Sequence, residues 1–148
     1  MRVAADSNIL VYAEGLGDLT HRDRAASLTA SLRLSGQLHV PAQVLGETFR
    51  VLIRKAGRSA AEAFASVSLW SATSVVEPST VAAYDSAFKL AASHGFDIWD
   101  ALILSVAAGA DCAMLLSEDM HHGFLWDGCT VVDPFREPAH PLMIALLK

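Results

Sequence analysis

The sequence predicts a three-layer α/β/α fold with a central, mostly parallel β-sheet. Short apolar runs alternate along the chain with longer segments of helical periodicity, which is the pattern of a parallel sheet covered by helices on both faces. Hydrophobic residues make up 53% of the chain and charged residues only 18%, a composition that excludes a disordered protein. A length of 148 residues suits one domain with its own hydrophobic core.

Five short apolar segments are predicted to be strands, namely 2–5, 38–40, 75–76, 113–116 and 130–132. Between them we expect a helix or turn at 9–14 and helices at 22–34, 43–56, 60–70, 80–93 and 98–108. A glycine directly follows or closely follows three of these helices, as is typical of helix C-termini. Ser59 and Ser79 are the expected N-caps of the helices at 60–70 and 80–93. The last predicted helix is apolar nearly all round and is therefore expected to be buried.

Residues 1–135 are predicted to form the domain, and residues 136–148 a C-terminal tail. The tail contains Pro138 and Pro141, followed by an apolar run at 142–147 that is predicted to be helical. These apolar side chains have to be buried, so the tail is expected to pack on the domain or on a partner.

Cys112 and Cys129 are not spaced as a C-x-x-C pair, and we expect both to be small buried apolar residues. The first residues lack the pattern of a signal peptide, and no apolar stretch is long enough to span a bilayer. The sequence therefore predicts a soluble, cytoplasmic protein that does not associate with membranes.

Acidic residues follow two of the predicted strands. Asp6 comes directly after the first strand, and Glu118 and Asp119 come after the strand at 113–116. Ligands of parallel α/β sheets bind beyond the carboxyl ends of the strands, so these positions are candidates for a site. A local role is the alternative, with Asp6 as a helix cap and Asp119 as a turn residue.

Three more acids lie on predicted helices. Asp97 fits the N-cap of the helix at 98–108, and the helix dipole favours both Asp97 and Asp100 at this end. Asp100 and Glu47 have apolar neighbours, and a carboxylate at the edge of a core needs a partner. Clustered carboxylates stay ionised around a cation, and all-oxygen ligands suit Mg²⁺ or Mn²⁺. Such a site indicates metal-assisted hydrolysis of a phosphodiester.

The net charge of −5 argues at first against a nucleic-acid partner. The charge is unevenly distributed, however, because residues 22–58 hold seven bases and only two acids. Within this region one helical face carries a polar stripe made of Gln43, Glu47, Arg50, Arg54 and Arg58. A solvated surface is the simpler interpretation of this stripe. The alternative is a basic track in which Arg50 and Arg54, with Arg58 as a further candidate, hold an RNA backbone.

Five segments resemble, in order, the motifs of PIN-domain ribonucleases: 6–13 (DSNILVYA), 47–52 (ETFRVL), 99–103 (WDALI), 115–120 (LLSEDM) and 131–135 (VVDPF). The resemblance covers residues 1–135 and is strongest to the VapC toxins of bacterial toxin–antitoxin pairs. It implies an endoribonuclease that depends on one or two Mg²⁺ or Mn²⁺ ions. It also implies a homodimer that is neutralised by a small antitoxin protein.

The resemblance also implies roles for individual residues. The catalytic metal ligands would be Asp6, Glu47, Asp100 and Asp119. Glu118 would be an extra or substitute ligand, and Asp97 a peripheral acid. Ser7 and Asn8 would orient the site.

Other function classes are less well supported. A phospho-acceptor receiver domain would have a lysine after a late strand, and an aspartyl phosphatase would have Asp-x-Asp after the first strand; neither pattern is present. The open alternative is a catalytically silent PIN-fold protein that binds RNA or another protein. The presence of all four acids argues against it, and binding of Mn²⁺ would distinguish the two.

Overall fold

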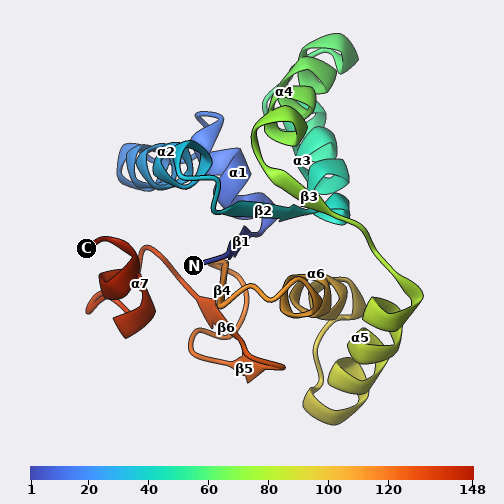
Figure 1. Ribbon diagram of the computed structural model, residues 1–148. Coiled ribbons are helices and arrows are strands. Elements are labelled where there is room, and N and C mark those ends of the chain that lie inside the picture. Colours follow the sequence, from blue (N-terminus) through green and yellow to red (C-terminus); the bar gives the residue numbers. More distant parts are fainter.

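The computed structural model describes all 148 residues, which form six strands and seven helices. The strands are β1 (Val3–Ala5), β2 (Leu38–Pro41), β3 (Val75–Glu77), β4 (Met114–Leu116), β5 (Leu125–Trp126) and β6 (Cys129–Val132). The helices are α1 (Ser7–Ala13), α2 (Leu19–Leu34), α3 (Ala42–Arg54), α4 (Ala60–Thr73), α5 (Val81–His94), α6 (Ile98–Gly109) and α7 (Pro141–Leu146). Helices α1 to α4 cover one face of the sheet and α5 and α6 the other (Figure 1). The predicted α/β/α fold class is confirmed.

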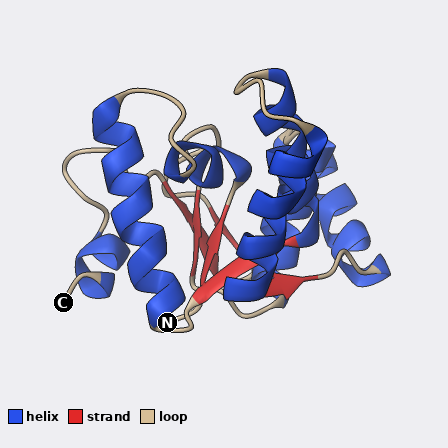
Figure 2. Cartoon of the chain, turned by 90° about the horizontal axis from the view of Figure 1, so that it is seen from above, coloured by secondary structure: helices blue, strands red, loops and turns tan.

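The six strands form one sheet in the order β3-β2-β1-β4-β6-β5. All neighbours are parallel except β5, which pairs antiparallel with β6. Seen from above, the strands lie near the middle of the molecule, with helices to the left and right of the view (Figure 2). In the β1–β4 pair Ala5 lies opposite Leu116, so the residues that follow, Asp6 and Ser117, leave the sheet side by side. This register positions the functional site.

The core is formed mainly by the parallel strands and α6. Every residue of β1 and β4 is buried, as is expected of strands covered on both faces. Helix α6 buries eight consecutive residues, 101–108, which confirms the prediction from its apolar sequence. Cys112 and Cys129 are both buried and free, and burial raises the pKa of each thiol to about 12. No helix is both long enough and apolar enough to cross a membrane.

Of the two serine N-caps predicted from the sequence, one is confirmed. The Ser59 hydroxyl accepts a hydrogen bond from the Glu62 backbone N–H, and the Glu62 side chain accepts one from the Ser59 N–H, which completes a capping box. The expected cap at Ser79 is wrong by one position. The Thr80 hydroxyl accepts from the Ala83 N–H instead, and the helix begins at Val81.

Strand β5 is missing from the sequence-based prediction. It has only two residues and faces β6 across a turn formed by Asp127 and Gly128, both of which have positive φ. Asp-Gly is the preferred sequence for a two-residue hairpin turn, so the signal was present but the strand was too short to stand out.

The C-terminal tail packs on its own domain. Its helix α7 begins with Pro141 and places Met143, which is 2% exposed, in the main core. Leu142 and Leu146 pack against the same core from partly buried positions. An ion pair between Arg24 and Glu137, at 3.5 Å, adds a surface contact between the tail and α2.

We therefore expect Met143→Ala to destabilise the whole domain. Removing a fully buried methionine side chain leaves a cavity and should lower the free energy of unfolding by about 2–5 kcal/mol. Ile144→Ala is the matched control, since Ile144 is 49% exposed on the same helix. Urea denaturation measures both. Equal effects of the two substitutions would show that the tail does not contribute to the core.

Candidate active site

Asp6 lies where β1 ends and α1 begins, and it is only 4% exposed. Its backbone N–H donates to the Leu116 carbonyl at 2.9 Å, which continues the pairing with β4 by one residue. The Ser7 N–H donates to Oδ1 at 2.7 Å, and the Ser117 hydroxyl donates to Oδ2 at 2.8 Å. Asp6 is the N-cap of α1, so the cap and the candidate site share one residue.

Burial raises the pKa of Asp6 from 3.8 to about 6. The hydrogen bonds from Ser117 and Ser7 lower that pKa and offset part of the rise, while the charges of Glu47 and Asp100 raise it further. Repulsion of this kind between carboxylates requires that they lie near one another. Three acids from β1, α3 and α6 therefore share one region.

Asp100 connects this group to the remaining acids. It is half-buried near the start of α6, and burial raises its pKa. The charges of Asp97, Glu47 and Asp119 raise this pKa further, in that order. The structure thus brings Asp6, Glu47, Asp100 and Asp119 to one edge of the sheet. Asp97 lies at the periphery, exposed, where its side chain caps α6 as predicted by accepting from two backbone N–H groups.

Asn8 links the ends of β1 and β4. Its Nδ2 donates to Asp119 Oδ2 at 3.1 Å and, more weakly, to Asp6 Oδ2 at 3.5 Å. Its Oδ1 accepts from the Glu118 backbone N–H at 3.4 Å. The side-chain amide of Asn8, on the first turn of α1, therefore bridges Asp6, which follows β1, and Asp119, which follows β4.

Gln43 links two helices of the acid group by hydrogen bonds, as Asn8 links the ends of two strands. Its Nε2 donates to Glu47 Oε1 at 2.8 Å and approaches the Trp99 carbonyl at 3.4 Å, which joins α3 to the start of α6. Its Oε1 is buried and has no hydrogen-bond donor. An acceptor oxygen therefore lies unmatched beside the carboxylate of Glu47.

The acids converge without forming a preassembled ligand cage. No three of the histidine, cysteine, aspartate and glutamate side chains of the chain lie close enough together to hold one ion in common. In this ligand-free arrangement, three of the four acids are instead hydrogen-bonded to neighbouring residues: Asp6 to Ser7 and Ser117, Glu47 to Gln43, and Asp119 to Asn8. The donor set is entirely oxygen, as hard cations prefer.

Glu118 belongs to a second network, on the side of α1 and α2. The Tyr12 hydroxyl donates to one of its carboxylate oxygens, and His21 Nε2 lies 3.1 Å from the other. His21 Nδ1 in turn lies 2.7 Å from Asp18, and this contact is the main reason that its pKa is raised. Burial, followed by the bond to Glu118, raises the pKa of Tyr12, so the phenol keeps its proton and acts as the donor.

The arginines of the predicted basic track separate into two groups. Arg50 and Arg54 are exposed on α3. Arg58 is engaged within the fold, since its guanidinium contacts Glu14 Oε2 at 2.8 Å and the Ser66 hydroxyl at 2.9 Å. A third hydrogen bond from Arg58 reaches the Glu14 carbonyl.

Sequence reasoning placed Gln43 in the polar stripe of α3 without a role in the site, and it did not single out Ser117, Tyr12 or His21. A signal for Ser117 was present, because it follows β4 as Asp6 follows β1, and neighbouring parallel strands place such residues together. Tyr12 and His21 are joined to the site by contacts between distant parts of the chain. Tyr12 and Glu118, for example, are separated by 106 positions.

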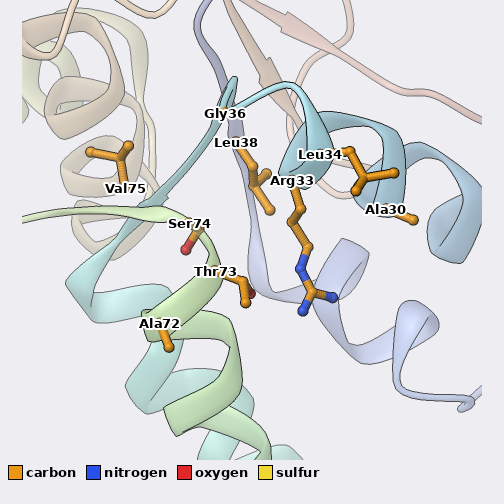
Figure 3. Close-up of a pocket in the computed structure, with 9 residues that line it drawn as sticks. All are labelled: Ala30, Arg33, Leu34, Gly36, Leu38, Ala72, Thr73, Ser74 and Val75. Carbon is orange, nitrogen blue, oxygen red and sulfur yellow. The ribbon is translucent and has the colours of Figure 1, made fainter.

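One cavity lies away from the acids. It has a volume of about 610 Å³ and is lined chiefly by small and apolar residues of α2, β2 and α4, with Arg33 as its one charged side chain (Figure 3). A cavity of about 540 Å³ borders the acid group instead, and its lining includes Ser7, Asn8 and Asp119. The location of the acids, and not cavity size, therefore indicates the site.

Asp6→Asn is expected to stabilise the metal-free protein at neutral pH. The pKa of Asp6 is raised on folding, so stability is highest below about pH 4, where both states are protonated, and falls as the pH rises through 6. Above that pH the ionised carboxylate costs on the order of 3 kcal/mol. Urea denaturation in EDTA at about pH 7.5 should give the Asp6→Asn variant a free energy of unfolding about 1–3 kcal/mol above wild type.

The same comparison at pH 4 should show a much smaller difference, because the wild-type carboxyl is then neutral. Asp85→Asn, at an exposed position on α5, is the control and should change little at either pH. A gain in stability at pH 4 equal to that at pH 7.5 would contradict the electrostatic explanation.

Comparisons with known proteins identify the fold and the family of the chain. A sequence comparison with curated proteins finds no match to the chain. VapC20 from Mycobacterium tuberculosis, described as a toxin that cleaves the sarcin–ricin loop, has a similar structure, with a TM-score of 0.66 and 22% sequence identity. The alignment covers 79% of this chain and 89% of VapC20.

A chain of the VapBC2 complex from Rickettsia felis, bound to a DNA fragment from its promoter, is also similar. Its TM-score is 0.62 and its identity 17%, over 80% of this chain and 88% of that one. At these identities the likeness establishes the fold. The family model of the PIN domain matches residues 3–122, which include all four converging acids. The chain therefore belongs to the PIN domain family.

Proposed function

We propose that this protein is a metal-dependent endoribonuclease and the toxin of a bacterial toxin–antitoxin pair. The observation that carries the proposal is the convergence of Asp6, Glu47, Asp100 and Asp119 at the carboxyl edge of a PIN-domain sheet. The likeness to VapC20, a toxin that cleaves an RNA loop, supports the same class of activity.

The residues of the site suit Mg²⁺ or Mn²⁺. The repulsion that raises the pKa of Asp6 is the kind that a bound cation relieves. The buried, unmatched Gln43 Oε1 suits a water or ion in the same region. Asp6, Glu47, Asp100 and Asp119 would hold one or two ions, with small rotations of their side chains. Such an ion activates water and stabilises charge on the phosphate.

The protein's other residues orient this group and bind the substrate. Ser7 and Ser117 donate to the two oxygens of Asp6 and thereby favour its ionised form. Asn8 holds Asp119 in place. The exposed guanidinium groups of Arg50 and Arg54 extend from Glu47 along α3 and would contact the RNA backbone. Arg58 is left out of this role because Glu14 already pairs with it.

A protein partner fits the same proposal. Large apolar side chains are exposed at Phe64, Val81 and Trp99, and such surfaces are often covered in complexes. The VapBC2 complex supports a small antitoxin as one partner. A second copy of the chain, as a homodimer, would cover further surface.

Asp6→Asn should abolish RNA cleavage in Mg²⁺, because it removes a ligand charge from the centre of the group. The measurement is the rate at which a labelled RNA is cut, with and without EDTA. The stability of the variant separates this loss from unfolding, since the same substitution is expected to stabilise the metal-free domain. Full activity of Asp6→Asn would rule out the assignment.

Binding of Mn²⁺ tests the silent alternative, which is favoured by the absence of three acids close enough to hold one ion in common. Calorimetry should detect Mn²⁺ binding to wild type at pH 7.5 and weaker binding below pH 6, where a proton competes at Asp6. The Asp85→Asn control should bind as wild type does. A protein that binds RNA but no Mn²⁺ would be the non-cleaving module.

Replacing Arg50 and Arg54 together by alanine should weaken RNA binding and reduce its salt dependence. Each lost phosphate contact lowers the slope of log K against log salt by about 0.7 for a single strand. The matched control is Lys89→Ala, an exposed cation on α5. Fluorescence anisotropy across a salt series measures the slope, and an unchanged slope in the double variant would exclude the basic track.

A further inference from the structure

A cavity of about 540 Å³, here called the Lys55 pocket, adjoins the proposed active site. Ser7, Asn8 and Asp119 form part of its lining, and Lys55 and Glu118 contribute further charges. Its volume is within the range of roughly 300–1,000 Å³ that is typical of small-ligand sites. A nucleoside attached to the reacting phosphate therefore has space to enter it.

The lining offers what a nucleotide needs. Val11, Leu16 and Val51 provide apolar surface against which a base can pack. Lys55 ends α3 at an exposed position and supplies a positive charge for a phosphate. Lys55 lies eight residues after Glu47, and Val51 lies midway between them, so all three follow one side of α3. Helix α3 therefore carries both a member of the acid group, Glu47, and two residues that line the pocket, Val51 and Lys55.

Glu118 faces this pocket with its orientation already set. Tyr12 and His21 each contact a different oxygen of its carboxylate. A carboxylate has about four lone-pair positions, so each oxygen retains capacity for one more donor. Two neighbouring acceptors match two neighbouring N–H donors. Among the RNA bases, guanine alone presents such a pair on one edge, at N1 and N2.

The wall that holds Glu118 is closely packed. Gly17 has φ +88°, and a Cβ at this position would lie only 2.6 Å from the ring of Tyr12. Phe135 meets the same ring edge-on, with centroids 5.3 Å apart. Tyr12 is therefore confined from two sides, and the carboxylate that it holds is preorganised for a ligand.

From this arrangement we infer that the Lys55 pocket binds a guanine nucleotide of the RNA next to the scissile phosphate. Glu118 accepts hydrogen bonds from guanine N1–H and N2–H, and Lys55 contacts a phosphate. The inference rests on the proposed ribonuclease function. It makes Glu118 a specificity residue and not a metal ligand.

Nucleotide binding tests the pocket without any cleavage. Calorimetry in EDTA should show that wild type binds 5′-GMP at least about fivefold more tightly than 5′-IMP, which lacks the N2 amine, or 5′-AMP. Glu118→Gln should reduce the affinity for 5′-GMP to that for 5′-AMP, and Lys55→Ala should weaken all three alike. Tyr12→Phe keeps the charge of Glu118 but not its anchor and should give an intermediate loss. Lys89→Ala is the control and should bind as wild type does.

Cleavage of RNAs that differ in a single base at the cut site gives the second readout. Wild type should show a higher kcat/KM with guanine there, and Glu118→Gln should lower this value about tenfold more for guanine than for the other bases. A uniform loss with every RNA, together with weaker Mn²⁺ binding, would make Glu118 a metal ligand and overturn the inference.

The two readouts separate the inference from the function on which it rests. Cleavage without base preference, and equal binding of the three mononucleotides, would refute the guanine site and leave the ribonuclease in place. Selective binding of 5′-GMP by a protein that cuts no RNA would refute the ribonuclease and retain the site.

Discussion

Asp6 carries a charge at the point where β1 leaves the core, and burial together with nearby acids raises its pKa to about 6. Two hydrogen bonds, from Ser7 and Ser117, are what keep the ionised form accessible near neutral pH. Both depend on the sheet, because the Ser117 hydroxyl reaches Asp6 only when β4 lies next to β1 in the observed register. The order of the strands therefore determines the electrostatics of Asp6, and the other acids of the group lie around this residue.

The topology explains how acids separated by more than a hundred positions come together. Neighbouring parallel strands direct Asp6 and Asp119 to the same edge, and α3 and α6 begin near that edge with Glu47 and Asp100 on their early turns. Gln43 and Asn8 then join these elements through side-chain amides. The mutual repulsion of the acids lowers the stability of the metal-free fold, as is common where a protein assembles like charges for function.

The site has two halves with different properties. The acid group carries excess negative charge and suits a cation, whereas the half formed by α1, α2 and the turn after β4 is organised by hydrogen bonds among Tyr12, His21 and Glu118. Lys55, Arg50 and Arg54 lie on α3, beyond Glu47. This separation reconciles a net charge of −5 with the proposed RNA substrate, because these three bases follow Glu47 on the same helix, beside the acids that a metal would neutralise.

The amino-acid sequence by itself determined the fold class, five of the six strands and the buried character of α6, since each rests on local periodicity or residue type. The resemblance of short motifs to the PIN domain family selected the four acids as candidates for the site. Cap residues and the ends of helices were predicted less well, as at Ser79, because neighbouring hydroxyls compete for the same role. Only the tertiary structure decided that Arg58 pairs with Glu14, that Ser117 donates to Asp6 and that Glu118 turns towards Tyr12 and His21. Such partners are chosen by strand order and helix packing, which bring distant residues within a few ångströms, and no local pattern encodes that distance.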